Sequence, residues 1–176
     1  MTTSRHIAAL ALFSFGFSAA VQASMVGDVL TIERLYPDLN THFRPSVSTT
    51  VAVGPSDAIN PFGWESVNPE ADSISIHWTG SSSYIGTSSV FDGYRFTGFS
   101  KPIQNVTVTD VNNITVAALG FGNDFITLNF GSYFDSSSSL NLQIQFAPVS
   151  LPGSLPLLLS GVVGMFAFAR KHRKGQ

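Results

Sequence analysis

The sequence predicts an all-β domain, an antiparallel β-sandwich or jelly-roll-like fold, flanked by an N-terminal signal helix and a C-terminal transmembrane helix. Apolar and polar residues alternate along several short segments, turn-forming residues separate these segments, and an uncharged apolar run lies near each end. Alternation with a period of two gives a strand one buried and one solvated face. We therefore divide the chain into a signal peptide (1–23), an extracellular β-sandwich domain (24–148) and a tail (149–176).

The N-terminal segment contains the three parts of a secretory signal peptide in their usual order. Arg5 supplies the positive charge, and residues 7–20 form the apolar run. Val21 and Ala23 give the small-residue pattern that precedes a cleaved bond, here the bond to Ser24. Because a signal peptidase removes segments of this kind, we expect cleavage between Ala23 and Ser24 and export of the remaining chain.

Alternation with a period of two recurs along the domain and predicts its strands. It covers the valines at 47, 51 and 53, residues 73–79, the valines at 106 and 108, residues 124–130 and residues 140–146. In the second of these segments Ile76 and Trp78 share one face, whereas His77 points to the other. We therefore expect Trp78 in the core and His77 in solvent. Tyr94 also alternates with apolar residues and is predicted to be buried.

Turn-forming residues fall between the alternating segments. Asp92–Gly93 and Gly122–Asn123 are pairs of the type that closes hairpins, because glycine and asparagine accept a positive φ at little cost. Residues 54–71, with three prolines and two glycines, predict a longer irregular loop. Binding and catalytic residues are found on such loops more often than on strands. Many short strands joined in this way are typical of antiparallel sandwiches and jelly rolls.

Charge is distributed unevenly along the chain. All eleven Asp and Glu residues lie within 24–148, where only four Arg and Lys residues balance them. The domain therefore carries a net charge of −7 (four minus eleven), although the whole chain is at −2. An acidic domain repels nucleic acid, so no nucleic-acid partner is expected. The absence of Cys excludes disulfides, thiolate metal sites and cysteine nucleophiles.

The C-terminal tail combines an apolar run with a basic end. Residues 155–169 carry no charge, and Arg170, Lys171, Arg173 and Lys174 follow. This run predicts a transmembrane helix, yet its length spans only roughly 22 Å of a bilayer core that is about 30 Å thick. The basic cluster is expected to stay on the cytoplasmic side, with the domain outside.

A proline-containing motif precedes the apolar run, and the whole arrangement resembles a known sorting signal. Val149, Leu151 and Pro152 form the motif, and Leu155–Pro156 begin the helix. Together with the basic cluster they are similar to the PEP-CTERM sorting domain, in the variant whose motif lacks Glu. The resemblance implies a Gram-negative bacterium that makes exopolysaccharide, and an exosortase-like enzyme that cuts near the motif. It also implies transient anchoring in the inner membrane, followed by display on the cell surface or release.

Candidate chemical sites within the domain are few. The Gly-x-Ser-x-Gly elbow of hydrolases is missing, and no catalytic residue is assigned. Glu65, Glu70 and Asp72 lie close in sequence and could bind Ca²⁺ through their oxygens. They could also supply the carboxylate pair of a glycoside hydrolase. Trp64 and Tyr84 could stack against a sugar, because aromatic side chains with a polar end suit that contact.

These observations favour a structural protein of the cell surface or of an extracellular matrix of exopolysaccharide, as in a biofilm, rather than an enzyme. One alternative is a carbohydrate-binding module that uses Trp64 and Tyr84. A weaker alternative is a glycoside hydrolase. The expected partners are a signal peptidase, the exosortase-like enzyme, the membrane and extracellular polysaccharide. No cofactor is expected apart from Ca²⁺ at the three carboxylates.

Overall fold

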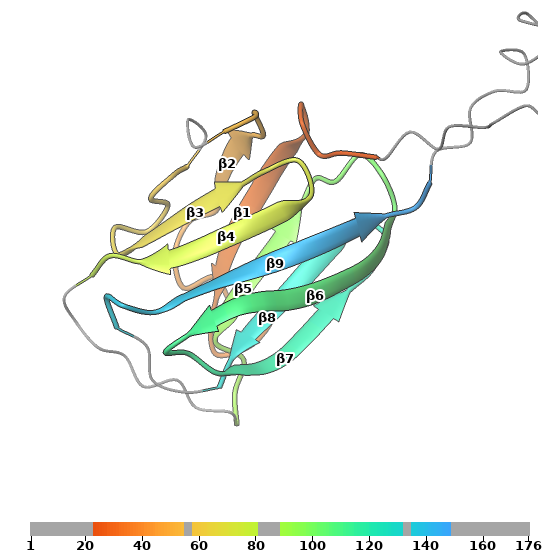
Figure 1. Ribbon diagram of the computed structural model, residues 1–176. Coiled ribbons are helices and arrows are strands. Elements are labelled where there is room, and N and C mark those ends of the chain that lie inside the picture. The colour runs from red at the N-terminus through yellow and green to blue at the C-terminus, as the bar shows by residue number, and fades with distance from the viewer. Residues whose placement is uncertain (1–22, 55–57, 81–88, 132–134, 149–176) are drawn as a thin grey trace, which may run out of the picture. The chain divides into compact units, whose positions relative to one another are not determined.

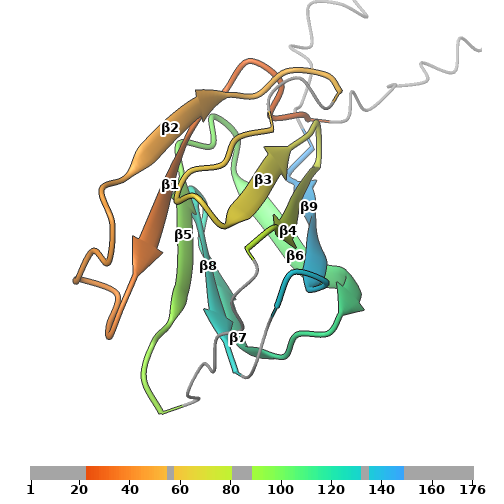
Figure 2. The same ribbon diagram turned by 90° about the vertical axis from the view of Figure 1, so that its left-hand side faces the viewer.

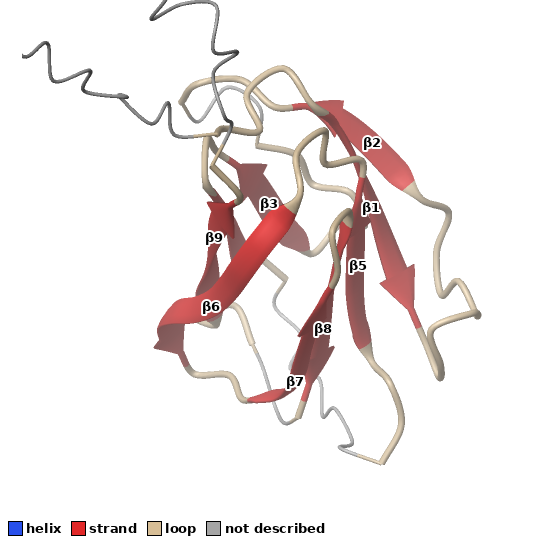
Figure 3. Cartoon of the chain, turned by 90° about the vertical axis from the view of Figure 1, so that its right-hand side faces the viewer, coloured by secondary structure: helices blue, strands red, loops and turns tan. Residues whose placement is uncertain are grey.

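The computed structural model describes residues 23–54, 58–80, 89–131 and 135–148. Gln22–Pro148 form one compact unit. Strands are the regular secondary structure of the described ranges, and no helix in them is long and apolar enough to cross a membrane (Figure 3). The predicted signal helix and the predicted transmembrane helix at about 155–169 lie outside the described residues.

The described strands form two antiparallel sheets (Figure 1). Their bounds are β1 (Val29–Leu35), β2 (Val47–Thr50), β3 (Glu65–Pro69), β4 (Ser73–Trp78), β5 (Gly93–Thr97), β6 (Ile103–Asn112), β7 (Val116–Phe121), β8 (Phe125–Phe130) and β9 (Ser139–Phe146). A five-stranded sheet has the order β2-β1-β5-β8-β7, and a four-stranded sheet has the order β3-β4-β9-β6.

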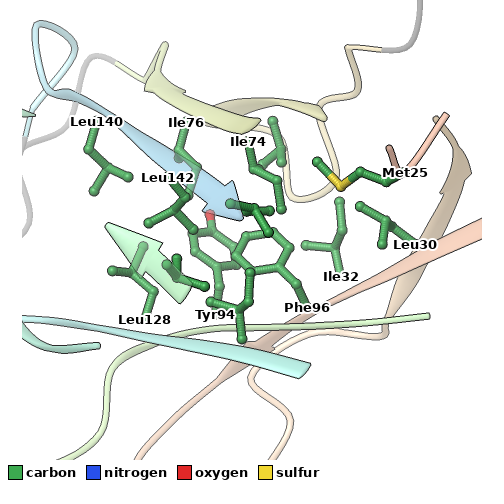
Figure 4. Close-up of a cluster of buried hydrophobic side chains, with 14 of the residues drawn as sticks. Met25, Leu30, Ile32, Ile74, Ile76, Tyr94, Phe96, Leu128, Leu140 and Leu142 are labelled. Carbon is green, nitrogen blue, oxygen red and sulfur yellow. The ribbon is translucent and has the colours of Figure 1, made fainter. Parts of the chain in front are cut away.

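The two sheets face each other and enclose one hydrophobic core (Figure 2). Ile32, Phe96 and Leu128 enter it from the five-stranded sheet, and Ile76 and Leu142 enter it from the four-stranded sheet. All five are fully buried, and Figure 4 shows them in one cluster. The prediction of an all-β fold with two antiparallel sheets is therefore confirmed. The finer comparison with a jelly roll stays a prediction.

The period-two pattern determines which side chains enter the core. In β4, Ile76 and Trp78 are buried and His77 between them is exposed, as predicted. Tyr94 in β5 is fully buried, which confirms its predicted place in the core. The predicted continuation of the alternation to Val53 is wrong, because β2 ends earlier and the side chain of Val53 is 78% exposed.

The two predicted hairpin pairs have different outcomes. Gly122–Asn123 joins β7 to β8 as predicted, and the N–H of Gly122 donates to the carbonyl oxygen of Phe125 at 3.0 Å. The prediction for Asp92–Gly93 is wrong, because Gly93 is the first residue of β5. A Cβ at Gly93 would lie 1.7 Å from the carbonyl oxygen of Leu128 in β8. Glycine is needed here for close contact between strands, not for a turn.

The irregular loop predicted for residues 54–71 contains a strand. β3 pairs with β4 from Glu65↔Trp78 to Pro69↔Ile74, so the prediction is wrong for this part. Pro69, one of the three prolines that suggested a loop, is the last residue of β3, and β3 is an edge strand of its sheet. A proline is tolerated at an edge because its missing N–H need not break a ladder between two strands.

Candidate binding surface at Phe43, Arg44 and Trp64

The loop that follows β1 folds back on the end of that strand and carries two exposed rings. Leu35 pairs with His42 in an isolated antiparallel bridge. The N–H of Phe43 donates to the carbonyl oxygen of Arg34 at 2.9 Å. These bonds hold Tyr36 and Phe43 at one end of the five-stranded sheet, where they are 39% and 48% exposed.

Trp64 approaches the same loop from the four-stranded sheet. It lies directly before β3, and its carbonyl oxygen accepts hydrogen bonds from the N–H groups of Thr79 (2.7 Å) and Gly80 (3.1 Å). A Cβ at Gly80 would lie 2.9 Å from the Cβ of Trp64, so glycine permits this close approach. The rings of Phe43 and Trp64 are 6.5 Å apart between centroids. Residues from both sheets therefore meet here only when the sandwich is folded.

We name Tyr36, Phe43, Arg44 and Trp64 the aromatic surface. The ring centroids of Tyr36 and Phe43 lie 6.3 Å apart in an edge-to-face arrangement. The guanidinium carbon of Arg44 lies 5.4 Å from the ring centroid of Phe43 and 5.2 Å from that of Trp64. Both distances are within the roughly 6 Å over which a cation is attracted to a ring face. The aromatic surface is thus a row of three rings with a cation held over two of them.

Arg44 differs from the other cations of the domain. The others are engaged as follows: Arg34 with Asp92, Arg95 with Glu33, and Lys101 with the carbonyl oxygen of Ser24 at 2.7 Å. Within the part of the chain that the structure describes, the Arg44 side chain makes no hydrogen bond or ion pair. Arg44 is also solvent-exposed, so its guanidinium donors are available to a ligand.

A buried polar cluster of Arg34, Glu65, Asp92 and Tyr94 adjoins the aromatic surface along the chain. Arg34 pairs with Asp92, and the hydroxyl of Tyr94 donates to Oε1 of Glu65. Burial raises the pKa of Glu65 to about 7 and raises the pKa of Tyr94 well above its ordinary value. None of the four is more than 5% exposed. These groups are too deeply buried to reach a ligand.

The structure places one of the two predicted sugar-stacking residues on this surface. Trp64 is partly exposed there, whereas Tyr84 lies outside the described residues. Sequence reasoning missed Tyr36, Phe43 and Arg44. The adjacent Phe43–Arg44 pair next to a proline was a visible signal, but its meaning depends on Trp64, which lies twenty positions further along.

The three carboxylates considered for Ca²⁺ or glycoside hydrolysis are not brought together. Glu65 begins β3 and Glu70 follows its end, so about 16 Å of extended chain separates them. The carboxylate of Glu70 accepts hydrogen bonds from the N–H of Gly54 (3.2 Å) and the amide of Asn68 (2.9 Å). No group of three His, Cys, Asp or Glu side chains that could hold a metal occurs among the described residues. Asp72 contributes its backbone carbonyl oxygen, which accepts the N–H of Ile144 at 2.7 Å.

The predicted cleavage site at the start of the domain lies inside the folded unit. Ala23 is 6% exposed, and the carbonyl oxygen of Ser24 accepts a hydrogen bond from Lys101. A peptidase needs an accessible, extended substrate, so the predicted cut has to precede folding. The motif residues Val149, Leu151 and Pro152 and the basic cluster at 170–174 lie outside the described residues.

Comparison with protein-family models, curated proteins and solved structures returned no match. The architecture alone therefore defines the class of the domain: a sandwich of two antiparallel sheets with an exposed aromatic surface.

Proposed function

We propose that this chain is an exported, non-enzymatic structural protein of the bacterial cell surface or the extracellular polysaccharide matrix. The support comes from the sequence of its two ends. The residues before Ser24 have the pattern of a signal peptide, and the tail carries a PEP-CTERM-like motif, an apolar run and a basic cluster. In this proposal a signal peptidase and an exosortase-like enzyme act in turn. The protein is held transiently in the inner membrane by its C-terminal helix and then displayed or released.

The intact mass of the mature protein tests this processing. The chain is expressed in a Gram-negative host that has an exosortase, and protein is collected from the surface and the medium. Loss of residues 1–23 together with a cut near 149–156 is the expected result. A mature chain that keeps residues 157–176 contradicts processing by an exosortase and leaves a permanent membrane anchor.

The aromatic surface favours a second and more specific function, the binding of polysaccharide. The observation that carries this proposal is the row of Tyr36, Phe43 and Trp64, in which Tyr36 and Phe43 are exposed and Trp64 is partly buried. Rings of this size contribute more to stability when they are buried in the core. Tyr and Trp combine a flat apolar face with a polar atom, as a sugar ring requires. Glycoside hydrolysis gains no comparable support, because Glu65 is fully buried and distant from Glu70.

Retention on immobilised polysaccharides tests the binding. The probes are neutral and acidic polymers together with the matrix polysaccharide of the host. Trp64→Ala is expected to lower retention at least about tenfold, since loss of an anchor residue of a binding surface costs more than roughly 1.4 kcal/mol. Phe125→Ala is the matched control, because Phe125 is 38% exposed in β8 and no part of the aromatic surface. Absence of retention on every polymer contradicts the proposal.

A further inference from the structure

We propose that the aromatic surface selects acidic polysaccharides, and that the guanidinium of Arg44 binds a carboxylate of the sugar. The inference rests on the proposed polysaccharide binding and specifies the class of ligand. Two properties of Arg44 carry it: the absence of an acidic partner and its position over two rings.

The first property is that Arg44 is the unpaired cation of the domain. Arg34 and Arg95 each pair with a carboxylate, and Lys101 donates to a backbone oxygen. Among the described residues, the side chain of Arg44 has no carboxylate or carbonyl partner. A ligand carboxylate would supply the missing partner.

The second property is the position of the guanidinium over the rings of Phe43 and Trp64. The attraction of a cation to a ring face uses none of the N–H donors of the guanidinium, and these donors make no hydrogen bond to the described residues. Those donors match the two oxygens of a carboxylate and bind it through parallel hydrogen bonds. The rings therefore hold Arg44 in an orientation that a carboxylate can use.

The same position disfavours a neutral sugar. A neutral sugar binds an aromatic side chain mainly by lying on its ring face, but Arg44 already lies over the rings of Phe43 and Trp64. Such a ligand would have to displace the cation from two rings. An acidic sugar can keep the cation in place, pair with it, and extend along the row towards Tyr36.

The acidic character of the domain limits this binding. A net charge of −7 repels a polyanion over the domain as a whole, so the contact at Arg44 acts against this repulsion. Binding that depends on one charge contact is screened by salt. An array of copies on a matrix would raise the overall affinity through multivalency.

The test compares polygalacturonate with its fully methyl-esterified form, in which the carboxylates are neutral but the polymer chain is the same. The full secreted protein is immobilised, and polymer binding is measured at low and high salt. Wild type is expected to bind polygalacturonate at least about tenfold more tightly than the ester, in line with a charge-assisted hydrogen bond. Arg44→Gln is expected to remove this preference. Arg44→Lys is expected to keep only part of it, because an ammonium lacks the planar fork.

Several results would overturn the inference. Equal binding of the acid and the ester, or an unchanged preference in Arg44→Gln, excludes a carboxylate contact at Arg44. If polyglutamate binds as tightly as polygalacturonate, the surface recognises the carboxylate alone, and recognition of a sugar is excluded. Binding of neutral polymers that is lost in Trp64→Ala, without binding of polygalacturonate, overturns the acidic ligand but leaves the proposed polysaccharide function intact. Binding of no polysaccharide contradicts both. Phe125→Ala and the circular dichroism spectrum of each variant control for folding.

Discussion

Tyr94 in β5 donates its hydroxyl hydrogen to Oε1 of Glu65 in β3, and this bond joins the two sheets through the core. The two residues are 29 positions apart in the sequence, and both are fully buried. Figure 4 shows Tyr94 within the cluster of apolar side chains that the sheets enclose. A carboxyl group in such surroundings is costly when charged, because burial removes the water that would stabilise the charge.

We predict that Glu65 makes the stability of the domain fall as the pH rises from 4.5 towards about 7. Burial raises its pKa in the folded state above its ordinary value of 4.5, so the folded state keeps a proton that the unfolded state loses. The stabilising contribution is complete below the unfolded pKa and is lost as the pH rises to the folded pKa. It is on the order of 3 kcal/mol. Urea denaturation between pH 5 and pH 8 measures it.

Glu65→Gln is expected to flatten this dependence, because Gln keeps an oxygen for Tyr94 and does not titrate. Glu70→Gln is the control, because it removes a carboxylate from the same segment and leaves the hydrogen bond between Tyr94 and Glu65 in place. Glu33 affects stability over a different range of pH. Its hydrogen bond with Arg95 lowers its pKa, so its contribution to the free energy of unfolding is lost only as the pH falls below 4.5. A slope that persists in Glu65→Gln contradicts the assignment.

We predict that Tyr94→Phe destabilises the domain by about 1–3 kcal/mol, since Glu65 then loses its hydrogen-bond donor in the core. The second oxygen of Glu65, Oε2, has no hydrogen-bond partner among the described residues. The hydrogen bond from Tyr94 lowers the pKa of Glu65, so its removal also extends the pH-dependent window upwards. Tyr36→Phe, at an exposed tyrosine, is expected to change the free energy of unfolding by less than about 0.5 kcal/mol. Equal losses in the two variants would argue against the inter-sheet bond.

The ion pair of Arg34 and Asp92 provides a third prediction. Their side chains are only 6% and 2% exposed, so Asp92→Asn leaves a buried guanidinium without its counter-charge. We expect a loss of about 3–5 kcal/mol in the free energy of unfolding. Replacement of both partners by apolar residues, Arg34→Met with Asp92→Leu, is expected to cost less than Asp92→Asn alone. If the loss in free energy of unfolding of the double variant equals the sum of the losses in Arg34→Met and Asp92→Leu, the pairing of the two side chains contributes little.

Gly93 provides the fourth prediction. A Cβ there would lie 1.7 Å from the carbonyl oxygen of Leu128, which belongs to the backbone of β8 and cannot rotate away. Gly93→Ala is therefore expected to cost more than about 4 kcal/mol or to prevent folding. Gly63→Ala is the control: its φ of 95° is unfavourable for alanine, but nothing lies within 4 Å. It is expected to cost only about 1–2 kcal/mol, as thermal unfolding would show.

The sequence indicated much of the fold because strand patterning is a local property. The alternation in residues 73–79, 124–130 and 140–146 predicted β4, β8 and β9 and the faces that they bury. Prediction from the sequence failed where a residue pattern typical of one local structure was present for a different reason. Asp92–Gly93 has the composition of a hairpin turn, yet its aspartate pairs with Arg34 and its glycine allows β5 to approach β8.

The sequence by itself determined the β-sandwich class and the buried or exposed side of most strand residues, whereas the export signals at both ends stay predictions. Only the tertiary structure decided which distant residues meet. It brings Phe43 and Arg44 after β1 to Trp64 before β3, and it pairs Glu65 with Tyr94 across the core. The physical reason is that side-chain periodicity depends on neighbours in the sequence. These contacts depend instead on the order and register of strands in two different sheets.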